Sequence, residues 1–68
     1  MNYKVFKSDD GYKYVQSDSD DFVASYKDGE WSSEKRFDST EINQLDQVED
    51  PYEISVIVKE AKKALHRY

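Results

Sequence analysis

Carboxylates are the most abundant side chains in this sequence that could do chemistry, because 15 of its 68 residues are Asp or Glu. The densest acidic run, Asp-Ser-Asp-Asp at residues 18–21, could offer calcium the hard oxygen ligands that it prefers. An EF-hand loop that began at Asp18 would, however, place Phe22 at its fifth position and Val23 at its sixth, where an oxygen ligand and a glycine are required. We therefore interpret this run as a solvated acidic turn and expect no metal site.

A histidine-based catalytic site would depend on His66, the only imidazole in the chain. His66 lies two residues from the end, and a precise geometry is hard to hold there because terminal turns fray. Paired carboxylates would need a cleft, and a domain this small rarely has room for one of roughly a few hundred cubic ångströms. The only glycines, Gly11 and Gly29, lie in turn-like sequences and not in a phosphate-binding loop. We expect a protein that is not an enzyme and has no cofactor.

Charge divides the chain into two unequal parts. Residues 1–58 carry six Lys or Arg against fourteen Asp or Glu, a net charge of −8, whereas residues 59–68 carry four against one, a net charge of +3. The basic part could bind phosphates through Lys59, Lys62, Lys63 and Arg67. The acidic part would repel a nucleic acid, so we treat nucleic-acid binding as the less favoured alternative. The lysines would otherwise form a solvated face that complements the helix dipole.

The acidic part itself suggests a binding surface. Scattered carboxylates can imitate a phosphate backbone or complement a basic groove on another protein, and exposed aromatic rings add anchors. Our leading hypothesis is a non-enzymatic protein-interaction module, an inhibitor or DNA mimic that acts on a basic nucleic-acid-handling protein. The predicted surface consists of Asp18, Asp20, Asp21, Asp28, Glu30, Tyr12, Tyr14, Tyr26 and Trp31. Two alternatives remain open: the aromatic rings cover the sheet for stability, or the exposed sheet forms a homodimer.

A meander of three to four short strands is expected to position these residues. Alternation of apolar and polar side chains predicts strands at about residues 3–7, 12–17, 22–27 and 30–37. Gly11 follows two aspartates in the first turn, and Asp28-Gly29 suits the type I′ turn of a tight hairpin because both residues can adopt positive φ. The polar middle of residues 30–37 predicts an exposed edge strand whose charges discourage aggregation.

Two helices are predicted after the strands. Asp38 and Glu41 resemble a capping box, and apolar residues follow at a spacing of three at Ile42, Leu45 and Val48. Together they predict a short helix at about residues 39–48. Asp50 as N-cap and Pro51 at the first helical position predict a longer helix at about residues 51–67. Its apolar stripe consists of Ile54, Ile57, Val58, Ala61, Leu65 and Tyr68. The β-branched residues at 54–58 leave open a fifth strand at residues 52–58.

The sequence therefore predicts one α+β domain over residues 1–68, an antiparallel meander with a C-terminal amphipathic helix packed on one face. Its core is small, and the absence of cysteine excludes a disulfide. No signal peptide and no membrane span are indicated, so we expect a cytoplasmic protein. In size and charge the chain is similar to small phage and bacterial accessory proteins, and no motif in it identifies a family.

Overall fold

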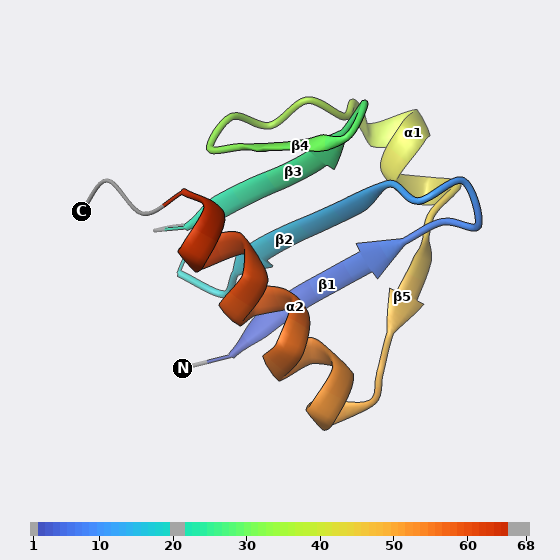
Figure 1. The fold of residues 1–68 in the computed structure, drawn as a ribbon. Coiled ribbons are helices and arrows are strands. Elements are labelled where there is room, and N and C mark those ends of the chain that lie inside the picture. Colours follow the sequence, from blue (N-terminus) through green and yellow to red (C-terminus); the bar gives the residue numbers. More distant parts are fainter. Residues whose placement is uncertain (1, 20–21, 66–68) are drawn as a thin grey trace.

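The computed structural model describes residues 2–19 and 22–65 and confirms the α+β architecture. Five strands form one antiparallel sheet in the order β4-β3-β2-β1-β5, and the longer of the two helices crosses one face of it (Figure 1). In chain order the elements are β1 (Tyr3–Lys7), β2 (Lys13–Ser17), β3 (Val23–Lys27), β4 (Glu30–Ser32), α1 (Ser39–Asn43), β5 (Asp46–Val48) and α2 (Pro51–Ala64).

The two glycine-containing turns have the backbone that the sequence predicts. Gly11 has a φ of 93° in the turn between β1 and β2. Asp28 and Gly29, which join β3 to β4, have φ values of 57° and 85°, and Lys27 pairs with Glu30 across the turn. Positive φ at both central residues is the requirement of a type I′ hairpin, whose twist matches that of the flanking strands.

The fourth strand is shorter than predicted, because β4 ends at Ser32 and the chain then leaves the sheet. The buried hydroxyl of Ser25 on β3 holds the departing segment through two hydrogen bonds. Its Oγ donates to the carbonyl oxygen of Glu34 at 2.8 Å and accepts from the N–H of Arg36 at 3.1 Å. The polar residues after Ser32 thus satisfy their backbone with a side chain and not with a strand.

The predicted helix at residues 39–48 is wrong in its second half. α1 begins as expected, with the Asp38–Glu41 capping box present, but it ends at Asn43. Residues 46–48 instead form β5, which pairs with β1 and places Val48 opposite Val5. Val48 is 6% exposed in this arrangement, so burial in the core overrides the helical spacing that suggested a longer helix.

The start of α2 is the one that the sequence predicts. Asp50 is the N-cap, its Oδ2 accepting from the N–H of Glu53 at 3.3 Å, and Pro51 is the first helical residue. The alternative of a fifth strand at residues 52–58 is therefore wrong. α2 ends at Ala64, before the predicted end at residue 67, and residues 66–68 lie outside the described part of the chain.

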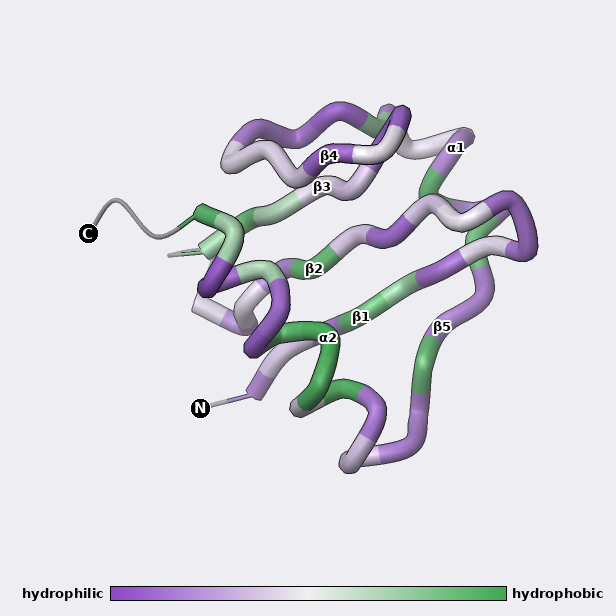
Figure 2. Tube along the Cα trace, viewed as in Figure 1, coloured by the Kyte–Doolittle hydropathy of each residue, from purple (hydrophilic) through white to green (hydrophobic). Residues whose placement is uncertain are grey.

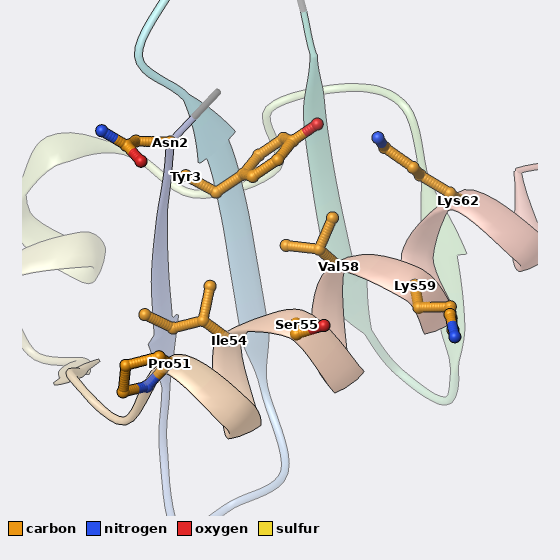
Figure 3. A pocket seen from close by; sticks show the side chains of 8 residues that line it. All are labelled: Asn2, Tyr3, Pro51, Ile54, Ser55, Val58, Lys59 and Lys62. Atoms are coloured by element: carbon orange, nitrogen blue, oxygen red, sulfur yellow. The ribbon is translucent and has the colours of Figure 1, made fainter.

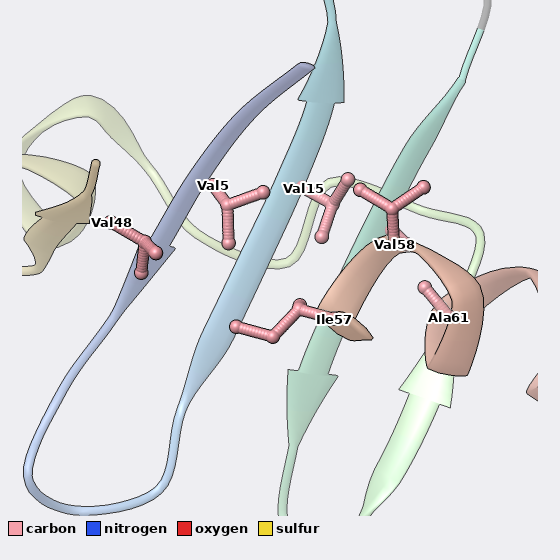
Figure 4. Packing of buried hydrophobic residues seen from close by; sticks show 7 residues of the cluster. Val5, Val15, Val48, Ile57, Val58 and Ala61 are labelled. Carbon is pink, nitrogen blue, oxygen red and sulfur yellow. The ribbon is translucent and has the colours of Figure 1, made fainter. Parts of the chain in front are cut away.

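The main core lies between α2 and the face of the sheet that Val5, Val15 and Ala24 share across β1, β2 and β3. Figure 4 shows the α2 side chains directed at these strands, and Figure 2 shows apolar residues along the helix and the strands beneath it. Seven buried residues form the cluster: Val5, Val15, Ala24, Val48, Ile57, Val58 and Ala61. This small core fixes α2 on the sheet.

The opposite face of the sheet is covered in part by Phe37. Its ring lies 6.1 Å from that of Tyr14 in a T-shaped arrangement, and Tyr14 is 1% exposed. Phe6 packs beside Tyr14 with a centroid separation of 6.2 Å. The segment after β4 therefore provides a second, aromatic layer. Among the described residues, no helix has the length and apolar character that crossing a bilayer requires.

Candidate functional site

Exposed carboxylates gather at one end of the sheet. The turns β1–β2 and β3–β4 and helix α1 lie together at this end in Figure 1, because alternate turns of an antiparallel meander emerge on the same side. β5 also begins here, since Asp46 pairs with Lys7 at the end of β1. We call this surface the acidic end and define it by Asp9, Asp10, Asp28, Glu30, Asp38 and Asp46, all of which are exposed.

The aspartates of the acidic end form no ion pair among the described residues, where the ion pairs involve glutamates. Glu30 lies 3.8 Å from Arg36, and Lys27 pairs instead with Glu41 of α1 at 3.5 Å. Lys13 and Lys27 also lie over aromatic rings, 5.2 Å from the Tyr26 centroid and 5.3 Å from the Phe37 centroid. Lys13 and Lys27 therefore contact aromatic rings and Glu41 of α1, and the aspartates stay available to a partner.

Lys7 is the third lysine near the acidic end, and it is bound to α2. Its Nζ forms an ion pair with Glu53, which joins the end of β1 to the first turn of the helix. The hydrogen bond and charge of Glu53 raise the pKa of Lys7, and the charges of Asp9 and Asp46 add to the effect. Glu53, with smaller contributions from Asp9 and Asp46, therefore favours the charged form of Lys7.

The predicted acidic surface is divided by the fold. Asp28 and Glu30 belong to the acidic end, whereas Asp18 lies in the β2–β3 turn at the opposite end of the sheet. Asp20 and Asp21 lie outside the described residues. Asp9, Asp10, Asp38 and Asp46 were not among the predicted site residues, although the alternation of turns in a meander could have brought them to attention.

The four predicted aromatic anchors differ in their surroundings. Tyr14 is buried beneath Phe37, so its predicted place on the exposed surface is wrong. Tyr26 and Trp31 are a cross-strand pair with a centroid separation of 5.2 Å, and both are half-buried. Tyr12 is half-buried against Phe37 at 5.9 Å. Much of this aromatic surface covers the sheet.

A small cavity of about 130 Å³ lies at the acidic end, between the β1–β2 turn and α1. Asp10 and Glu41 contribute its carboxylates, and Tyr12, Phe37 and Leu45 contribute apolar surface. Pockets that enclose substrates are usually about 300–1,000 Å³. Within residues 2–19 and 22–65, no three His, Cys, Asp or Glu side chains form a cluster that could hold a metal ion.

A larger groove of about 650 Å³ lies beside α2, where the helix passes the start of β1 (Figure 3). We call it the α2 groove; its lining residues are Asn2, Tyr3, Pro51, Ile54, Ser55, Val58, Lys59 and Lys62. Sequence patterns placed Lys59 and Lys62 on a basic helix but gave no sign of a groove, because the facing wall comes from the distant N-terminal strand.

No protein-family model, curated protein or solved structure matches this chain.

Proposed function

We propose that this protein is a cytoplasmic, non-enzymatic interaction module that binds a basic surface of a nucleic-acid-handling protein and acts as its inhibitor or as a DNA mimic. The observation that carries the proposal is the acidic end. Five exposed aspartates from two turns, the cap of α1 and the start of β5 gather there without ion pairs among the described residues. A basic groove that evolved for phosphates would attract such a surface.

The way in which the carboxylates of the acidic end are attached also supports this function. Its carboxylates are attached to short turns and capped elements, including a two-residue hairpin and the Asp38 capping box. The Lys27–Glu41 ion pair joins α1 to β3. A surface that keeps its shape before binding loses little conformational entropy on binding.

The proposal is tested by affinity capture from bacterial lysate with the wild-type protein and two charge-reversed variants. One variant carries Asp9→Lys, Asp10→Lys and Asp28→Lys at the acidic end. Its matched control carries Asp18→Lys, Glu34→Lys and Glu60→Lys, which change the net charge equally at exposed positions elsewhere. We expect the wild type and the control to retain a nucleic-acid-binding protein that double-stranded DNA displaces, and the acidic-end variant to lose it.

Three outcomes count against the proposal: capture of no nucleic-acid-binding protein by the wild type, equal loss in the two variants, or failure of DNA to compete. Circular dichroism of both variants ensures that a loss of capture reflects charge and not unfolding.

A further inference from the structure

We propose that the α2 groove binds an extended acidic peptide segment of a partner protein. This second binding site is distinct from the acidic end and takes a ligand of the opposite charge. The proposal stands independently of the function proposed above.

Charge is the first argument, because both charged residues that line the groove are lysines. Lys59 and Lys62 are three positions apart and therefore lie on the same side of α2. No Asp or Glu is part of the lining, and the ion pairs between described residues do not involve either lysine. Of the two acidic residues of α2, Glu53 pairs with Lys7 and Glu60 is not part of the lining. The groove is thus a local positive site on an acidic molecule.

Lys62 is also held in place over the groove. Its Nζ lies 5.0 Å from the centroid of the Tyr3 ring and 5.8 Å from that of Phe22, and Figure 3 shows its ammonium beside the Tyr3 ring. Tyr3 and Phe22 are themselves in edge-to-face contact at 6.2 Å. Two cation–π contacts restrict this side chain before any ligand arrives, which lowers the entropy cost of an ion pair with a carboxylate.

The shape of the groove suits an extended chain. Its helical wall runs from Pro51 to Lys62, about 17 Å at 1.5 Å per residue, which matches roughly five residues of extended peptide. Ile54, Val58 and the Tyr3 ring offer apolar surface, whereas Ser55 and Lys59 are exposed at the rim. Successive side chains of an extended peptide point in opposite directions. Apolar side chains can therefore face the wall while acidic ones reach the lysines.

A nucleic acid fits this site less well than an acidic peptide. A polyanion would approach a protein whose net charge is −5, and two lysines would neutralise few of its phosphates. A short peptide with one or two carboxylates matches the two lysines and leaves little uncompensated charge. The observations therefore favour a protein partner.

The test is a selection of short random peptides, displayed on phage, against the full protein. We expect the enriched peptides to alternate acidic and apolar residues. A synthetic copy of the most enriched one should bind about tenfold or more weakly to the Lys59→Glu/Lys62→Glu variant. The matched control, Lys35→Glu/Lys63→Glu, changes the net charge equally at exposed positions outside the lining and should bind within about twofold of the wild type.

Ser55→Trp provides a second variant, because it fills the rim of the groove from an exposed position without removing a core side chain. It should also weaken peptide binding about tenfold, with the circular dichroism spectrum unchanged. The proposal is overturned if no peptide is enriched, if the enriched peptides are not acidic, or if they bind both lysine variants equally. Tighter binding of a single-stranded DNA oligonucleotide than of the selected peptide at the same lysines would also overturn it.

Discussion

Asp50 directs the chain into α2 through a single hydrogen bond, which its side chain accepts from the N–H of Glu53 at 3.3 Å. Asp50→Ala should lower the free energy of unfolding by about 1 kcal/mol, because it leaves a helix N-terminal donor without its protein acceptor. Urea denaturation measures this change. Glu49→Ala, at the exposed neighbouring position, should stay within about 0.5 kcal/mol of the wild type. Equal losses in the two variants would show that α2 does not depend on its cap.

The Lys7–Glu53 ion pair should make stability depend on pH in the alkaline range. The folded pKa of Lys7 is raised from its ordinary value of 10.5, chiefly by the hydrogen bond to Glu53. A raised pKa means that the pair stabilises the fold fully below pH 10.5 and that this contribution disappears as pH rises through the folded pKa. The difference in unfolding free energy between the wild type and Lys7→Met should therefore shrink above pH 10.5. A constant difference would contradict the assignment.

Single residues with a local role were the most predictable features of this sequence. The positive φ at Gly29 and the caps at Asp38 and Asp50 depend on neighbours within three positions, so the sequence carries the whole signal. Tyr14 was not predictable in this way. Its burial depends on Phe37, a residue that follows the β3–β4 hairpin in the sequence and packs back on Tyr14.

At the scale of elements, the errors in the sequence prediction come from long-range partners. Ile42, Leu45 and Val48 have helical spacing, yet residues 46–48 form β5 because β1 offers an unpaired edge and a place in the core for Val48. β4 stops at Ser32 because Ser25 binds the backbone of the following segment. Neither partner is near in sequence, and intrinsic propensity is weak enough for such contacts to override it.

The segment after β4 should stabilise the sheet chiefly through Phe37, which is 3% exposed and packs on Tyr14. Phe37→Ala should cost about 3 kcal/mol or more, which approaches the whole stability expected for a domain of this size. We therefore expect thermal unfolding near or below room temperature. Phe37→Leu should remain folded with a reduced Tm, and near-ultraviolet circular dichroism should report the loss of ordered packing at Tyr14.

Phe6 supplies the control for this prediction, because it also contacts Tyr14 but is only half-buried. Phe6→Leu should lower the Tm less than Phe37→Leu. If the two substitutions have equal effects, the segment after β4 does not act as a covering layer and Phe37 has no special part in the fold.

At the scale of the whole molecule, the fold rearranges the charge that the sequence only divides into two parts. The meander brings the β1–β2 and β3–β4 turns to one end of the sheet and Asp18 to the other. Acidic residues that the prediction assigned to one surface are therefore separated in space. The α2 groove forms only when Tyr3 meets the helix from the opposite end of the chain. Composition could predict an acidic protein with a basic helix, and only the topology shows two separate surfaces.

Two surfaces of opposite charge should act independently at physiological salt and influence each other at low salt. The molecule measures 30 × 24 × 20 Å, whereas the Debye length is about 8 Å at 0.15 M ionic strength and about 30 Å at 0.01 M. The Asp9→Lys/Asp10→Lys/Asp28→Lys variant should therefore bind a peptide selected on the α2 groove within about twofold of the wild type at 0.15 M. At 0.01 M the same variant should associate with the acidic peptide faster than the wild type, because the field that repels the peptide has been reversed.

Stopped-flow fluorescence of a labelled peptide measures both regimes. The Asp18→Lys/Glu34→Lys/Glu60→Lys variant has the same net charge but places two of its lysines beside the α2 groove, because Asp18 is hydrogen-bonded to the lining residue Asn2 and Glu60 follows Lys59. It therefore compares charge close to the groove with charge at the acidic end. Similar acceleration in both variants at 0.01 M would indicate that net charge governs the encounter. A change of tenfold or more in affinity at 0.15 M, confined to the acidic-end variant, would contradict independence. It would mean that the acidic end and the α2 groove are coupled through the sheet and not through solvent.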